Sequence, residues 1–94
     1  MAEELLATIE DADRTFAHQI ELLNQAIQDL DRYEEAARAY SERHPEHAST
    51  GHVIADSLKS LQDLLHNVVD QHNRVAAVLA EKKQEVQQYE PDSI

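Results

Sequence analysis

Apolar side chains recur at alternating steps of three and four residues from the start of the chain to His44, with no glycine or proline between them. This spacing places them on one face of an α-helix, and it predicts a first helix over about residues 3–43. In heptad notation the predicted seam comprises Leu6, Ile9, Asp13, Phe16, Ile20, Leu23, Ile27, Leu30, Glu34 and Ala37. The pattern is that of a coiled-coil seam with two charged interruptions.

A polar segment over about residues 44–52 predicts a turn, because it contains Pro45 and the only glycine, Gly51. Proline disfavours helical backbone in the residue before it, so the first helix is expected to end at His44. Ser49 or Thr50 can cap the helix that follows.

The same alternation of three and four resumes after the turn and predicts a second helix over about residues 53–89. Its predicted seam comprises Ile54, Leu58, Leu61, Leu65, Val68, His72, Val75, Leu79, Lys82, Val86 and Tyr89. Pro91 marks the end of this helix, and residues 90–94 are expected to form a frayed tail.

The two predicted helices, roughly 60 and 55 Å long, match closely enough to lie side by side. The expected fold is therefore all-α, a single domain over residues 1–94 that forms an antiparallel two-helix coiled-coil hairpin. A straightened turn with two chains pairing as long helices is the alternative, and Pro45 and Gly51 favour the bend. A turn centred near residue 47 sets Asp13 opposite Lys82, and this charge pair is expected to fix the register, since a one-heptad slide would leave each charge without a partner.

One flank of the predicted hairpin is markedly apolar. The residues predicted to form an interface on it are Leu5, Ala12, Ala26, Tyr33, Tyr40, Leu64 and Val78. The opposite flank is mixed and more easily left in water. A short hairpin with one apolar broad side is typical of half a four-helix bundle, so we expect a homodimer or, alternatively, a complex with a different helical protein.

The composition of the chain narrows the range of possible partners. The formal net charge of −11 disfavours direct binding to nucleic acid or to an anionic membrane, and a charged partner would be basic. The chain has no cysteine, its N-terminus is acidic, and no segment reaches membrane-spanning length. We therefore expect a cytoplasmic protein, with secretion by a signal-independent route left open.

The histidines are the main candidates for site chemistry. His44, His47 and His52 gather in the predicted turn and could hold a transition metal, although a solvated loop that does not orient the rings would bind it weakly. His72 at a seam position is more often a satisfied interface histidine than a ligand. No nucleophile–base spacing, glycine-rich phosphate loop or paired catalytic carboxylates are apparent, so neither enzymatic activity nor a cofactor is expected.

The sequence thus favours a non-enzymatic protein–protein interaction module, such as an adaptor, small chaperone or scaffold, acting through helical surfaces. The alternative is an acidic decoy or inhibitor that occupies a basic nucleic-acid-binding site on another protein. Spread over roughly 60 Å, the net charge amounts to about one per 5 Å, well below the one per 1.7 Å of duplex DNA. Weak metal binding through the turn is the third possibility.

Overall fold

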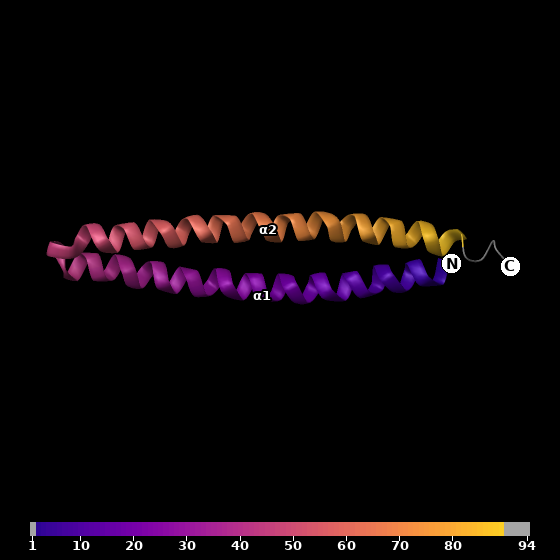
Figure 1. Ribbon diagram of the computed structural model, residues 1–94, viewed down its shortest axis with the longest axis horizontal. Coiled ribbons are helices and arrows are strands. Elements are labelled where there is room, and N and C mark those ends of the chain that lie inside the picture. Colours follow the sequence, from indigo (N-terminus) through magenta and orange to yellow (C-terminus); the bar gives the residue numbers. More distant parts are fainter. Residues whose placement is uncertain (1, 90–94) are drawn as a thin grey trace. The chain divides into compact units, whose positions relative to one another are not determined.

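A computed structural model describes residues 2–89, which are helical apart from one turn residue: α1 (Ala2–Arg43), the short 3-10 helix η1 (Pro45–His47) and α2 (Ala48–Tyr89). The two long helices pack against each other as a hairpin (Figure 1), which confirms the expected all-helical hairpin. The chain divides into two compact units. Residues 22–69 form the turn unit, and the described residues of the two terminal segments, 2–21 and 70–89, form the terminal unit. The predicted tail, residues 90–94, lies outside the described residues.

Helix α1 follows its sequence pattern closely. Glu3 and Glu4 in its first turn and Arg43 in its last place charges where the helix dipole favours them. Ion pairs three or four residues apart, including Arg14 with Asp11, add local support.

The turn is shorter than the sequence suggested. His44 leaves the helical conformation (φ −128°, ψ 74°) because it precedes Pro45, and η1 then connects directly to α2. The Ala48 N–H donates to the Pro45 carbonyl, and α2 begins at Ala48, ahead of the expected start near residue 53. Three residues of 3-10 helix are enough to reverse the chain, so the polar residues after His47 are free to continue as helix.

Gly51 lies inside α2 rather than in the turn, and it is buried. A Cβ at this position would stand 1.9 Å from the Ser41 Oγ and 2.8 Å from the Ala37 carbonyl oxygen. The missing side chain therefore lets the start of α2 approach the end of α1. Ser41 also joins the two helices, because its hydroxyl donates to the Ala48 carbonyl at 2.9 Å.

In the turn unit α1 supplies the large buried side chains, and α2 supplies small or polar ones. The buried residues of α1 are Ile27, Leu30, Glu34 and Ser41, all but Ser41 belonging to its predicted seam. The buried residues of α2 are Gly51, Ala55 and Gln62, with Leu58 and Leu65 half-buried.

The seam predicted for α2 is therefore wrong at alternate positions. Ile54, Leu61, Val68 and Val75 were assigned to the seam but are exposed. The residue that follows each of them along the chain turns inward instead, and those residues are Ala55, Gln62, Val69 and Ala76. Because one residue corresponds to a rotation of about 100°, α2 packs with a neighbouring flank toward α1.

In the terminal unit the first part of α1 packs beside the last part of α2. Ile9 is buried, and Lys83 of α2 reaches Glu10 of α1 at 3.6 Å. Phe16 meets the His72 ring edge-on at a centroid distance of 5.3 Å. The expected register paired Phe16 with Leu79, so this contact lies one heptad away from expectation.

Candidate protein-binding surface

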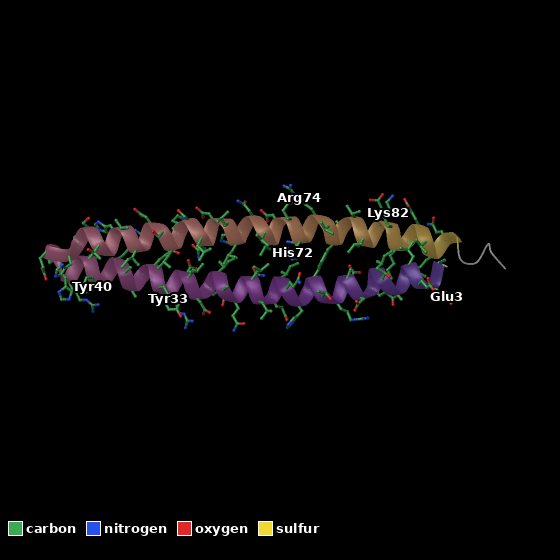
Figure 2. The ribbon with its side chains drawn as sticks, in the orientation of Figure 1. Glu3, Tyr33, Tyr40, His72, Arg74 and Lys82 are labelled. Carbon is green, nitrogen blue, oxygen red and sulfur yellow. The ribbon has the colours of Figure 1, made fainter. Side chains whose placement is uncertain are left out.

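Exposed apolar side chains dominate one side of the turn unit. Within residues 22–69 the large apolar side chains left exposed are Leu22, Tyr33, Tyr40, Val53, Ile54, Leu61, Leu64 and Val68. Six of them form what we term the apolar side, namely Tyr33, Tyr40, Ile54, Leu61, Leu64 and Val68. Two of these, Tyr33 and Leu64, are 56% and 60% exposed, far from the burial that a large apolar side chain gains in a core. Figure 2 labels Tyr33 and Tyr40 on α1.

The helical repeat places these residues together. Tyr33 comes one residue before the buried Glu34, and Leu61 comes one residue before the buried Gln62. Both are therefore rotated by about 100° from the face that packs inward. Since α1 and α2 run in opposite directions through the hairpin, the preceding residue lies on the same side of the pair in both helices. Tyr40 and Ile54 likewise each come one residue before a buried residue of their own helix.

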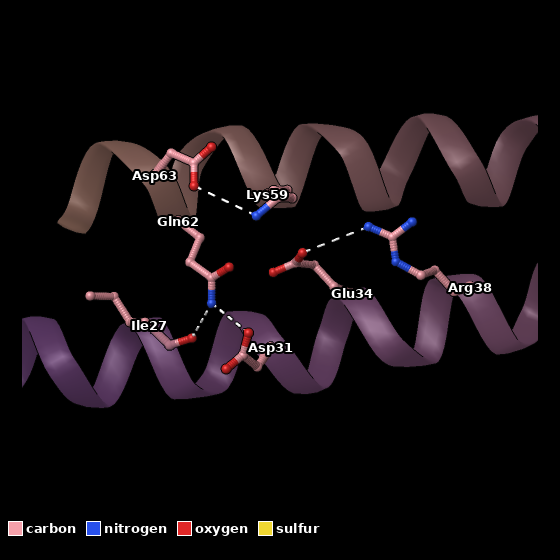
Figure 3. A network of polar contacts seen from close by, with 7 residues as sticks. All are labelled: Ile27, Asp31, Glu34, Arg38, Lys59, Gln62 and Asp63. Carbon is pink, nitrogen blue, oxygen red and sulfur yellow. Dashed lines mark hydrogen bonds and ion pairs between the residues drawn. The ribbon is translucent and has the colours of Figure 1, made fainter. Parts of the chain in front are cut away.

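The opposite side of the turn unit carries a polar network (Figure 3). Gln62 of α2 donates from Nε2 to the Ile27 carbonyl at 2.9 Å and to Asp31 Oδ1 at 2.6 Å. Lys59 pairs with Asp63 on the surface of α2 at 3.7 Å. The Gln62 contacts across the helices satisfy a buried amide, and they favour the observed rotation of α2 over one that would bury Leu61.

Glu34 is an unusual member of this network. Its side chain is only 10% exposed, and its Oε1 meets Arg38 at 3.9 Å, a long ion pair. Its Oε2 is buried with no hydrogen-bond partner among the described residues. An acidic side chain at this seam position therefore contributes little stability and leaves a desolvated oxygen between the helices.

The terminal unit has exposed apolar residues of its own, Leu5, Val75 and Val78. Figure 2 shows His72 between α1 and α2, where a ring nitrogen lies 2.9 Å from Gln19 Oε1. A shallow hollow of about 250 Å³ beside Phe16 and His72 is small for a ligand site. His72 thus takes part in the packing of the two helices.

The predicted interface residues fall into two groups. Ala12 and Ala26 are half-buried beside the seam, and the exposed ones are Leu5, Tyr33, Tyr40, Leu64 and Val78. Exposure is what an interface requires. The sequence missed Ile54, Leu61 and Val68 as surface residues because it assigned them to the seam. The signal that could have identified them is the small pair Gly51 and Ala55, which suits the inner face near a tight turn.

The residues of the predicted register pair lie in the terminal unit. Asp13 is half-buried, and the Lys82 side chain is 55% exposed and contacts Glu85 of its own helix at 3.2 Å. Their pairing remains a prediction, which a double variant of Asp13 and Lys82 tests.

The turn histidines lie on the surface. The His44 and His47 rings approach Tyr40, with centroid distances of 4.5 and 6.5 Å, and His44 Nδ1 lies 3.4 Å from Glu46. His52 is exposed on the first turns of α2. Across residues 2–88, no three His, Asp or Glu side chains gather in a way that could hold a metal ion.

Neither of the two long helices, over the part of the chain described, includes a stretch apolar enough to cross a membrane. Comparisons with protein-family models, curated proteins and solved structures give no match to this chain.

Proposed function

We propose that the protein is a non-enzymatic interaction module, an adaptor, small chaperone or scaffold, that binds another helical protein through its apolar side. The observation that carries this proposal is that α2 leaves Ile54, Leu61 and Leu64 exposed while burying Ala55 and Gln62. Contiguous exposed apolar residues on a small protein are typical of an interaction surface.

The expected assembly is a four-helix bundle in which two hairpins face each other across their apolar sides. A helical pair with few large buried side chains gains most from covering a second face, and this is how two hairpins form a bundle. The occupant of the apolar side is either a second copy of the chain or a different helical protein.

The acidic-decoy alternative would use the opposite side of the molecule. By helical periodicity the carboxylates on that side of the turn unit are Asp31, Glu35, Glu42, Asp56 and Asp63. Two bases, Arg38 and Lys59, are interspersed with them. Mixed charge is a weak imitation of a polyanion, and a decoy leaves the exposed apolar side unexplained.

Co-purification from native lysate tests the proposed function. The wild-type chain is compared with Leu64→Glu, which places a charge on the apolar side, and with Gln28→Glu, which adds the same charge on the opposite side, at the exposed position after the buried Ile27. We expect the wild type and the Gln28 variant to retain the same specific partner, whether a tagged second copy or another helical protein, and the Leu64 variant to lose it.

Two outcomes would overturn the proposal. One is the same partner at the same yield from all three proteins. The other is a nucleic-acid enzyme that remains bound to Leu64→Glu and dissociates steeply with salt, which would favour the decoy.

A further inference from the structure

We infer that the occupant of the apolar side is a second copy of this chain, packed about a twofold axis that passes near Leu61. This inference rests on the proposed function and specifies its partner. Leu61 is at the middle of the exposed stripe on α2, which runs over about 20 Å from Ile54 to Val68. A twofold axis at its centre would place Leu61 of one copy close to Leu61 of the other.

The distribution of charge is the first argument. The net charge of −11 opposes any association of two copies. On the apolar side, however, the positions between the six apolar residues hold Ala36 and Ser57, which are uncharged. The charged residues that border it on α1 are Asp29, which pairs with Arg32, and Arg43. Two such sides can face each other without opposing like charges.

The acidic residues lie elsewhere, and this distinguishes a second copy from a basic partner. A basic protein would be attracted to the side that carries Asp31, Asp56 and Asp63, because that side has complementary charge. The neutral apolar side offers a basic partner little electrostatic attraction. A surface that lacks charge, on a chain that is otherwise strongly acidic, is the surface that an acidic chain needs in order to bind itself.

The available area is the second argument. Half of an aromatic side chain offers about 100 Å² and half of an aliphatic one about 50 Å², so the two tyrosines and four aliphatic residues present about 400 Å². A stable interface buries about 800 Å² on each partner, of which roughly 450–500 Å² is apolar. The turn unit alone therefore supplies most of the apolar area that one half of a dimer requires.

The mass of the purified full-length chain tests this inference. We expect light scattering or sedimentation to give twice the chain mass of 10.7 kDa. Raising the salt concentration should preserve or strengthen the dimer, since the remaining charges repel each other. A single-chain mass at the highest concentrations reached, or a dimer that dissociates as salt rises, would overturn the inference.

Opposite charges at Leu61 locate the interface. Leu61→Glu and Leu61→Lys, each alone, should weaken self-association by at least about 30-fold, as expected for a residue at the centre of an interface. Mixing the two variants should restore a dimer that contains one copy of each, because the charges then attract. The Gln28→Glu variant, on the opposite side, serves as the control and should remain dimeric.

Several outcomes separate this inference from the proposed function. If both Leu61 variants are folded, as judged by helical circular dichroism, and remain dimeric, the interface lies elsewhere and the inference is wrong. If the variants unfold, the inference is tested by the mass of the unaltered chain alone, measured as protein and salt concentrations are varied. A monomeric wild type that still binds another helical protein through Leu64 would contradict the second copy and leave the proposed function standing.

Discussion

The two helices of the turn unit bury different kinds of residue. Helix α1 directs Ile27 and Leu30 inward, whereas α2 directs Ala55 and Gln62 inward and keeps larger side chains such as Leu61 exposed. Both helices carry a similar amphipathic repeat, so the difference does not arise from how apolar each one is. It arises from which flank of α2 can approach α1.

The difference shows that close approach near a tight turn can outweigh the burial of large side chains. Gly51 permits α2 to lie against Ser41 and the Ala37 carbonyl, and this contact sets the rotation of α2 at its first turns. Gln62 then finds a backbone carbonyl and a carboxylate across the seam. With that rotation established, the large residues of α2 remain available for a surface beyond the hairpin.

Truncating one large residue on each helix should give the largest difference in unfolding free energy between the two helices. Leu30→Ala removes a buried side chain and should lower the free energy of unfolding by about 3 kcal/mol. Leu61→Ala removes an exposed one and should cost less than about 1 kcal/mol in dilute protein. Urea unfolding followed by circular dichroism measures both.

Protein concentration sharpens the same comparison. The cost of Leu61→Ala should grow as the chain is concentrated, because association buries this side chain, while the cost of Leu30→Ala should stay nearly constant. Equal losses of unfolding free energy for the two variants in dilute protein would show that α2 also buries the large apolar residues around Leu61.

Gly51→Ala tests the close approach of α2. Alanine gains about 1 kcal/mol of helix propensity, but its Cβ would collide with the backbone oxygen of Ala37, which cannot move without shifting α1. Overpacking of this kind costs about 1–3 kcal/mol, so we expect a net loss of about 1 kcal/mol in unfolding free energy and a larger loss for Gly51→Val. The control Ser60→Ala, at an exposed site on α2, should be neutral or slightly stabilising. A stabilised Gly51→Ala protein would mean that the helices are not held at this distance.

Glu34→Leu tests whether the buried carboxylate on α1 lowers the stability of the fold. Replacing a desolvated carboxylate that has an unsatisfied oxygen by an apolar side chain should raise the melting temperature and stabilise the fold by about 1 kcal/mol. The adjacent exposed residue provides a control, since Glu35→Leu should change stability by less than about 0.5 kcal/mol. If Glu34→Leu destabilises the protein, the ion pair with Arg38 matters more than its length of 3.9 Å indicates.

The smallest effect is expected at Asp13 and Lys82. If they pair across the helices, Asp13→Leu and Lys82→Leu should each destabilise the protein, and the double variant should recover most of the loss. Because the Lys82 side chain is more than half exposed, solvent screening should hold each effect to about 1 kcal/mol or less. A double-mutant cycle from thermal unfolding measures the coupling, and strict additivity would show that the two residues do not meet.

Much of the fold could be predicted because its signals are local. The absence of breakers before His44, the conformational effect of Pro45 and the apolar repeat of α1 each act within a few residues. The exposure of Tyr33, Tyr40 and Leu64 could likewise be predicted from the helical repeat. The role of Gly51 could not, because a glycine signals a turn and a close helix contact equally well until its neighbour on the other helix is known.

Two helices, their reversal near Pro45 and the inward face of α1 follow from the sequence alone, since one apolar stripe on α1 is clearly the widest. The inward face of α2 depends instead on contacts between the two helices. Leu58 and Leu65 belong equally to two overlapping repeats, one completed by Ile54 and Leu61 and the other by Ala55 and Gln62. Periodicity counts apolar positions along one helix, whereas the choice between two flanks depends on distances and hydrogen bonds to the other helix. Those exist only once the chain has folded.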